Sequence, residues 1–395
     1  MTTAHAVDIG AIERELRQLW KENAAEAGGQ AVTRALTLNL VARATDSATA
    51  DMISAVVQQL TASHPNRTVL AVVQAAAEPW LEAYVQANCL LPSRGAPQVC
   101  GEQITINARG AAVGQVASLV LPLLVPDLPV VLWLPGPAPL DDPLLGRLRG
   151  VLDRLIVDSR SFTDPAAGLL QLATFDAAEH SGPGNGPQAP ALSDLAWTGL
   201  TPWRELTAQF FDTRPLLPYL HRIDRAEISY VPADGKPNPL EGLLIAGWLA
   251  ACLGWSPLSD GISVQGDTLR LHLRRAAVGV GPSATRPVTV EISPLLPNHP
   301  QITQIAQMAE QPGLAALHLR AVDGVTADFS VVRADEPGYA LTTAQVAGQA
   351  PVRRLARCEQ PGLADLLAAE LRLLSRDRTF GAALKMASAF AAHLE

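Results

Sequence analysis

A strand–helix–strand pattern near the amino terminus places the strongest constraint on how this chain can fold. Residues 34–42 (RALTLNLVA) alternate in the manner of a half-buried strand. Asp46 or Ser47 can cap a following helix, and residues 68–73 are typical of a buried strand. A β-α-β unit of this kind predicts a sheet with a covering helix.

The residues that follow continue the same layered pattern. Segments 80–87 and 103–108 alternate again and bracket a loop that contains Pro92, Gly95 and Pro97, which predicts a long-looped hairpin. Further elements are expected in this order: a buried helix at 113–124, a strand at 130–134, a helix at 144–152 and a strand at 155–158. The amphipathic segment 9–20 predicts a helix before the first strand. The N-terminal part is therefore expected to be an α/β domain, a mixed sheet with covering helices.

A stretch dense in Gly and Pro, residues 179–190 (EHSGPGNGPQAP), marks a linker. We predict three parts: an α/β N-terminal domain at 1–176, a Gly/Pro-rich linker at 177–192, and an α+β C-terminal domain at 193–395. Segment 226–231 is expected to be a strand, and segments 269–273, 288–292, 315–321 and 327–332 are expected to form an antiparallel sheet in the C-terminal domain. Asn238 and Pro239 open an apolar helix that ends near Gly254, and a long terminal helix runs from Leu363.

Composition excludes several classes of function. The formal net charge of −8 argues against nucleic acid, because such binding depends on Lys and Arg that neutralise phosphates. The charge-free stretch at 110–126 is shorter than a bilayer needs and is broken by proline, so no membrane span is expected. No signal peptide is visible, and the default compartment is the cytoplasm.

No motif for a cofactor, a metal or catalysis is predicted. Residues 181–187 (SGPGNGP) satisfy neither the dinucleotide-binding nor the P-loop pattern, and the cysteine spacing does not fit zinc. An alternative is a sugar-phosphate- or nucleotide-binding enzyme with a site near His64, Arg67 and Asp158. His64 and Arg67 lie at the mouth of one predicted buried strand, and Asp158 lies at the C-terminal end of another, where open α/β sheets often hold ligands. Ser159 lacks a recognisable general base and is interpreted as a turn residue. A structural scaffold for oligomerisation is a third hypothesis.

The four cysteines leave redox chemistry open. Cys89 and Cys100 lie at the two shoulders of the predicted hairpin loop, within bridging range if the strands pair. In a reducing cytosol we expect two free thiols, and a disulfide there would be regulatory. Cys252 is expected to pack within the apolar helix. Cys358 lies near several arginines, which would lower the pKa of an exposed thiol.

Two of the seven tryptophans, Trp197 and Trp203, lie six residues apart in the segment SDLAWTGLTPWREL (193–206). Burying a tryptophan demands a specific site with a partner for its N–H, which predicts a docking element. One interpretation seats it between the two domains, and the other seats it on a partner protein. Trp203 with Arg204 is the pair most expected to contact a partner, since interfaces are enriched in Trp and Arg.

Taken together, several segments resemble the glucose-6-phosphate dehydrogenase assembly protein family, OpcA. They are IERELRQLW (12–20), HPNR (64–67), CGEQI (100–104), SLVLPLLVPDLPVVLWLPG (118–136), VDSRSF (157–162), SDLAWTGLTPWREL (193–206) and EGLLIAGWLAACLGW (241–255). The resemblance covers most of the chain.

The resemblance implies a non-catalytic partner that promotes the active oligomer of glucose-6-phosphate dehydrogenase and so feeds the oxidative pentose phosphate pathway. The expected mechanism is allosteric activation by preferential binding of the active state. Candidate interface residues are Trp197, Trp203, Arg204, His64 and Arg67. In photosynthetic relatives thioredoxin is expected to act through cysteines, and Cys89, Cys100 and Cys358 are the candidate redox thiols here.

Overall fold

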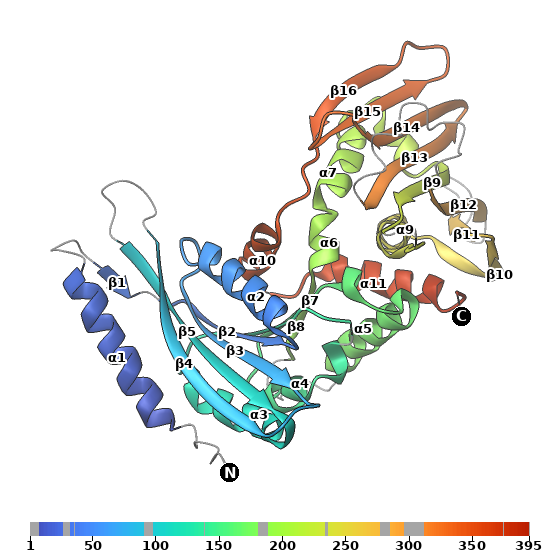
Figure 1. Ribbon diagram of the computed structural model, residues 1–395. Coiled ribbons are helices and arrows are strands. Elements are labelled where there is room, and N and C mark those ends of the chain that lie inside the picture. The colour runs from blue at the N-terminus through green and yellow to red at the C-terminus, as the bar shows by residue number, and fades with distance from the viewer. Residues whose placement is uncertain are drawn as a thin grey trace. The chain divides into compact units, whose positions relative to one another are not determined.

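The computed structural model groups the chain into two compact units (Figure 1). The structure describes residues 8–26, 32–34, 36–90, 98–137, 139–180, 189–233, 236–276, 285–295, 312–373 and 375–394. The first unit comprises Met1–Ser161, Ala177–Leu195 and Gly362–Asp377, and the second comprises Phe162–Asp176, Ala196–Pro361 and Arg378–Glu395.

Residues 181–188, the centre of the predicted linker, lie outside the described residues, as does the SGPGNGP segment. They are bordered by α5 (Pro165–His180) and β8 (Ala191–Asp194). The boundaries at 176 and 193 therefore stay a prediction.

An eight-stranded mixed sheet forms the first unit. Its order is β1-β5-β3-β2-β6-β7-β8, with β4 antiparallel to β5 and all other neighbours parallel. The strands are β1 (Val32–Arg34), β2 (Leu38–Ala44), β3 (Asn66–Gln74), β4 (Trp80–Leu90), β5 (Gln98–Arg109), β6 (Val130–Leu134), β7 (Arg154–Val157) and β8. The β-α-β unit and the hairpin that the sequence predicts are both confirmed.

Helices and short 3₁₀ turns cover the two faces of this sheet. They are α1 (Ile9–Glu26), α2 (Ser47–Leu60), η1 (Gly110–Gln115), α3 (Val116–Val120), η2 (Leu121–Leu123), η3 (Pro139–Asp141), α4 (Pro143–Leu148), η4 (Ser159–Ser161) and α10 (Leu363–Leu371). One face packs against α2 and α10 in a single apolar cluster that includes Leu40, Trp133 and Leu366. On the other face Asn39 bonds to the backbone of Val125.

The second unit is built on an eight-stranded sheet in which antiparallel pairs dominate. Its order is β10-β11-β12-β9-β13-β14-β15-β16, and only β9 and β12 run parallel among these described strands. The strands are β9 (Ile223–Val231), β10 (Ser256–Gln265), β11 (Thr268–Ala276), β12 (Thr285–Pro294), β13 (Gly313–Asp323), β14 (Val325–Arg333), β15 (Tyr339–Val346) and β16 (Val352–Arg357). The expected fold class, α/β followed by α+β, is confirmed.

One face of this second sheet is covered by helices. The apolar α9 (Leu240–Leu253) packs on β9, β12 and β13, and α11 (Arg378–Ala391) packs on α9 (Figure 1). Phe329 of β14 packs against Phe210, Phe211 and Tyr219, from η5 (Phe210–Asp212) and α8 (Leu217–Leu220). Gly254 caps α9 with a left-handed backbone, as its position predicts.

Three elements differ from the sequence expectation. The terminal helical region forms two helices, α10 and α11, which belong to different units. The helix expected at 113–124 is the short α3 between η1 and η2, because Pro122 cannot continue an α-helical ladder. α9 begins at Leu240, one residue after Pro239, which the sequence predicts as its first residue, and the Leu240 N–H donates to Asn238 Oδ1 at 3.1 Å.

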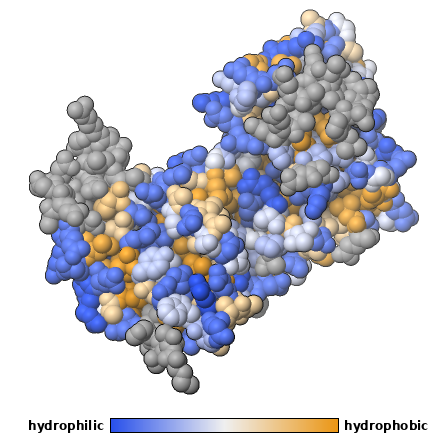
Figure 2. Space-filling model, viewed as in Figure 1, coloured by the Kyte–Doolittle hydropathy of each residue, from blue (hydrophilic) through white to orange (hydrophobic). Residues whose placement is uncertain are grey.

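None of the helices in the described part of the chain is long and apolar enough to cross a membrane. On the face that Figure 2 shows, hydrophilic residues separate the hydrophobic patches.

Gly247 sets how closely α9 and α11 approach. A Cβ placed there would lie 2.4 Å from the backbone oxygen of Ala383. Gly247→Ala is therefore expected to lower the free energy of unfolding by about 1–3 kcal/mol, since the backbone must move. Gly146→Ala, in α4 with nothing within 4 Å, is expected to raise it by about 0.5–1 kcal/mol. Urea unfolding measures both, and equal effects would contradict the close packing.

Candidate functional site

Trp197 and Trp203 are seated inside the second unit. The chain passes from the first unit to the second between Leu195 and Ala196, within α6 (Leu195–Gly199). Trp197 is 3 % exposed and Trp203, on α7 (Thr201–Gln209), is 4 % exposed. The ring of Trp197 packs on Phe380 with 5.6 Å between centroids.

Arg204 holds this segment together by contacts with Trp197 and Thr201. Its guanidinium carbon lies 3.4 Å from the centroid of the Trp197 ring, a cation–π contact. The same guanidinium donates to the Trp197 carbonyl at 3.1 Å and to Thr201 Oγ1 at 2.9 Å. The docking element has an internal seat, and contact of these residues with a partner stays a prediction.

Arg67 lies at the centre of a buried polar network in the first unit. It is 4 % exposed, and its Nε donates to Glu102 Oε2 at 2.7 Å. Its Nη1 donates to Glu13 Oε1 at 2.8 Å and to the Leu123 carbonyl at 3.0 Å. Glu102 also accepts from Trp20 Nε1 at 2.6 Å. The network thus joins α1, β3, β5 and η2, and its residues lie in four of the segments that carry the resemblance.

The expectation of two free thiols at Cys89 and Cys100 is wrong, because the structure joins them in a disulfide. The two residues lie directly opposite each other on β4 and β5, with Cα atoms 4.1 Å apart. The expectation rested on the redox state of the cytosol, whereas strand register decides proximity. Gly101 lets this end of β5 approach β3, since a Cβ there would lie 2.8 Å from the Asn66 carbonyl oxygen.

The two remaining cysteines also differ from expectation. Burial raises the pKa of the Cys358 thiol to about 11, and the nearby Arg333 only partly opposes this. The exposure on which the expected lowering of the pKa depended is therefore not met. Cys252 is exposed and does not pack in the core. It lines an apolar cavity of about 380 Å³ together with Leu217, His221 and Trp248.

The residues of the alternative enzyme site do not come together. Arg67 lies at the amino end of β3, and Asp158 follows the carboxyl end of β7 in the same set of parallel strands, with β2 and β6 between them. Arg67 therefore lies at the amino ends of the parallel strands, and Asp158 lies at their carboxyl ends. His64 is paired with Ser63 at 3.0 Å, and burial, aided by Arg372, lowers its pKa.

The carboxyl edge near Asp158 is occupied by internal bonds. Ser159 is fully buried and donates from Oγ to Asp194 Oδ2 at 2.6 Å. Arg160 forms two hydrogen bonds to Asp158, each 2.8 Å long. This arrangement agrees with the interpretation of Ser159 as a turn residue.

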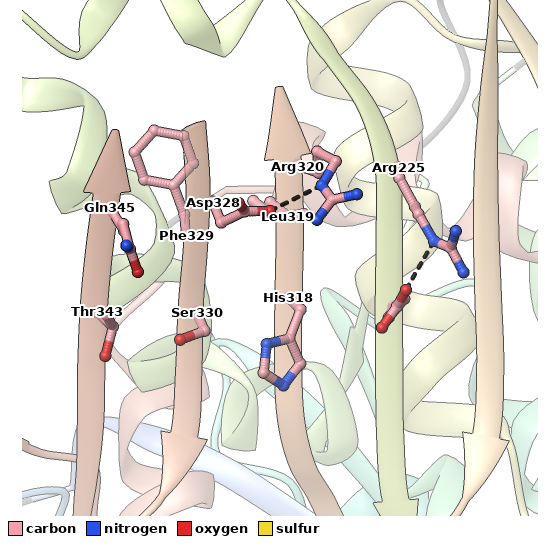
Figure 3. Close-up of a pocket in the computed structure, with 10 residues that line it drawn as sticks. Arg225, His318, Leu319, Arg320, Asp328, Phe329, Ser330, Thr343 and Gln345 are labelled. Atoms are coloured by element: carbon pink, nitrogen blue, oxygen red, sulfur yellow. Dashed lines mark hydrogen bonds and ion pairs between the residues drawn. The ribbon is translucent and has the colours of Figure 1, made fainter. Parts of the chain in front are cut away.

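A polar groove of about 450 Å³ crosses the open face of the second sheet (Figure 3). Its floor comes from β9, β13, β14 and β15. Arg320 of β13 lies between Arg225 and Asp328 on the neighbouring strands, and His318 lies between Glu227 and Ser330. Figure 3 shows the side chains of Arg225, His318, Arg320, Asp328 and Ser330 on the same face of the sheet.

The charges of the groove are paired both between neighbouring strands and within one strand. Arg320 Nε donates to Asp328 Oδ1 at 2.9 Å, and Arg225 Nε lies 2.6 Å from Glu227 Oε1. Burial lowers the pKa of His318, while Glu227 and Asp328 oppose the shift. Sequence reasoning missed this groove. Its signal is the run of alternate polar residues in each strand, such as His318 and Arg320 in β13.

Comparisons with known proteins match both parts of the chain. Residues 57–174 match the family model described as the glucose-6-phosphate dehydrogenase subunit N-terminal domain. Residues 190–384 match the model of the corresponding C-terminal domain. The chain belongs to the OpcA family.

Curated relatives of the chain carry the name "Putative OxPP cycle protein OpcA". The chain is 32 % identical over 194 residues to the Nostoc punctiforme protein, covering 49 % of this chain and 39 % of that relative. It is 30 % identical over 220 residues to the Synechocystis sp. protein, covering 55 % of this chain and 43 % of that relative. The match thus spans less than half the length of these OpcA proteins.

Among solved structures, the oxidoreductase from Sinorhizobium meliloti aligns with 91 % of each chain, at a TM-score of 0.45 and 12 % identity. At this similarity neither fold nor activity transfers to the OpcA chain.

The buried Arg67–Glu102 pair is open to a direct test. Arg67→Met leaves the fully buried Glu102 carboxylate without its main partner, so we expect the free energy of unfolding to fall by about 3–5 kcal/mol. Arg14→Met breaks the exposed Arg14–Asp8 pair, 3.2 Å long, and should change it by less than about 1 kcal/mol. Chemical denaturation compares the two variants. A loss at Arg67 no larger than the loss at Arg14 would show that the network does not hold the unit together.

Proposed function

We propose that this chain is a non-catalytic assembly factor and allosteric activator of glucose-6-phosphate dehydrogenase, acting in the oxidative pentose phosphate pathway of the cytoplasm. The observation that carries the proposal is the match of both parts of the chain to models described as domains of a dehydrogenase subunit. The curated relatives, named for the OxPP cycle, support the same pathway.

The mechanism we propose is a shift of population. A partner that binds the active oligomer more tightly than the inactive enzyme raises the active fraction by the ratio of the two affinities. The non-catalytic role is supported by two polar groups that the sequence offers as candidates for an enzyme site, because both are engaged in hydrogen bonds and ion pairs within the protein. Ser159 donates to Asp194, and Arg67 is paired with Glu102 and Glu13.

We place the dehydrogenase contact on the open face of the second sheet, at the groove of Arg225, His318, Arg320 and Asp328. Its paired charges and polar side chains resemble the mixed polar composition of non-obligate interfaces. Trp203 and Arg204 would act by keeping α6 and α7 packed in the same unit, because both support the segment internally. Direct contact of the dehydrogenase with Trp197, Trp203, Arg204, His64 or Arg67 is the competing placement.

The activity of the dehydrogenase, titrated with this chain, tests the function and the placement. We expect the wild-type chain to raise the activity and to co-elute with the enzyme. Arg320→Glu should raise the concentration for half-maximal activation about fivefold or more, because it reverses a charge in the groove. Arg14→Glu reverses the charge of another exposed, carboxylate-paired arginine, in the first unit, and serves as the control.

The outcomes separate the two claims. Absence of both activation and co-elution with the wild-type chain overturns the function. Equal effects of the two variants move the contact away from the groove, and Trp203→Ala then tests the competing placement. Lost activation with an unchanged melting temperature would assign Trp203 to the partner.

For redox control we propose that thioredoxin reduces the Cys89–Cys100 disulfide. The dithiol of thioredoxin supplies two electrons and two protons, the S–S bond breaks, and thioredoxin leaves as its own disulfide. The bridge lies two residues before Glu102 on the same face of β5, so its reduction loosens the strand that holds the Arg67 network.

Reduction by thioredoxin is expected to lower the free energy of unfolding by about 2–3 kcal/mol, the range for a closed loop of this size. The concentration of chain for half-maximal activation should rise with it. A Cys89→Ala/Cys100→Ala variant should behave like the reduced chain under both conditions, while Cys252→Ala should keep the response. Thermal melts and activation titrations, run oxidised and reduced, measure this. A reduced chain with unchanged melt and activation contradicts redox control.

A further inference from the structure

On the helix-covered face of the second sheet, the inward residues change from apolar to charged at one end of the strands. In β11 the inward positions Leu269, Leu271 and Leu273 are buried and apolar, and the next inward position is Arg275. In β12 the inward series Ile292, Val290 and Val288 continues to Arg286. β9 follows the same pattern, with Asp224 beyond Ile228 and Ala226.

Arg275 and Arg286 lie directly opposite each other in the β11–β12 ladder. Like charges directly opposite destabilise a strand pair. The open face of the same sheet holds a second such pair, Arg225 and Arg320, but there each arginine has a carboxylate partner, Glu227 and Asp328. Among the described residues, no carboxylate lies within 4.0 Å of Arg275 or Arg286.

Two donor atoms of Arg275 are also buried without hydrogen bonds. Only 6 % of the residue is exposed, and its Nε and Nη1 find no acceptor in the described part of the chain. Guanidinium donors withdrawn from water and left unpaired carry a substantial free-energy penalty. Burial of the Arg275 guanidinium is therefore unfavourable unless a hydrogen-bond acceptor binds to it.

The surrounding charges do not neutralise the pair. Burial lowers the pKa of Arg275, and Arg286 and Arg222 lower it further, whereas Asp224 acts in the opposite sense. Asp224 itself has a pKa raised by burial. Arg222 has a counterion of its own, because its Nη1 lies 3.3 Å from Asp323 Oδ1. Positive charge is thus in excess around the unpaired donors.

From the buried, unpartnered Arg275 and the facing Arg286, we infer an anion site at this end of the sheet that takes the phosphate group of a small metabolite. Arg275 supplies the fork of donors that matches two phosphate oxygens. Arg286 is exposed and supplies a second charge at the mouth of the site. A dianion fits better than a carboxylate, because two guanidiniums repel each other until a charge of −2 lies between them.

The test uses the whole chain and inorganic phosphate, in a buffer otherwise free of phosphate and sulfate. Isothermal titration calorimetry gives the affinity, and melting curves with increasing phosphate give the stabilisation, which grows with ligand concentration over Kd. Sodium chloride at matched ionic strength is the reference. The variants are Arg275→Met and Arg274→Met, which remove the same charge from adjacent positions of β11. Arg274 is exposed on the opposite face of that strand.

The expected result has two parts. Phosphate binds the wild-type chain and the Arg274→Met variant alike, and at least about tenfold more weakly to Arg275→Met, a change of about 1.4 kcal/mol. Without phosphate, Arg275→Met melts at or above the wild-type temperature, because the unpaired buried donors are gone.

Two results overturn the site. One is an equal response of all three proteins to phosphate and chloride, which shows a general salt effect. The other is a lower melting temperature of Arg275→Met without phosphate, which gives Arg275 a structural role. The experiment contains no dehydrogenase, so its outcome is independent of the proposed assembly function.

Discussion

The ion pair between Arg67 and Glu102 is the contact on which the first unit most depends. Both side chains are almost fully withdrawn from water, which is unfavourable for either charge alone by several kcal/mol. The arrangement persists because each charge has further partners: Arg67 bonds to Glu13 and the Leu123 carbonyl, and Glu102 accepts from Trp20. Four separate segments must therefore be in place together, so the N-terminal helix is held to the sheet by polar bonds as well as by the burial of Ile12 and Leu16.

Periodicity predicts the central elements of both sheets well, and the reason is burial. In β11 and β12 the inward residues are apolar at every second position up to Arg275 and Arg286, so alternation identifies these strands before any contact is known. β2 and β3 are buried at nearly every position, and the continuous apolar run of β3 identifies that strand. β10 and β16 escape the same reasoning because they are the edge strands of their sheet, and most of their residues are exposed. The split of the terminal region into α10 and α11 also escapes it, since a helical pattern does not reveal which core each helix joins.

The site residues divide in the same way. Trp197 and Trp203 demand a specific seat whatever the fold, and the sequence predicts this correctly. The identity of the seat depends on Phe380, which is 183 positions after Trp197 in the chain (380 − 197). The partner of Arg67 is equally remote, because β5 becomes its neighbour only when the sheet is assembled. For Cys89 and Cys100, the predicted hairpin already brings the two cysteines within bridging range, and the register of β4 and β5 places them directly opposite each other. The prediction of free thiols followed instead from the reducing state of the cytosol.

The two arginine pairs of the second sheet show how one residue type acquires two roles. Arg225 and Arg320 stand on the open face, where water and the carboxylates of Glu227 and Asp328 balance their charge. Such a surface can be covered by a partner with little electrostatic penalty, since its charges are already paired. Arg275 stands at the end of the covered face, where neither water nor a carboxylate reaches Nε and Nη1. The difference comes from the alternation of the strand, which sends Arg274 to one face and Arg275 to the other. Arg274 and Arg275 have the same side-chain chemistry, but they point to opposite faces because successive residues of a strand alternate. One arginine therefore lies on a solvated surface, and the other lies in a site that needs an anion.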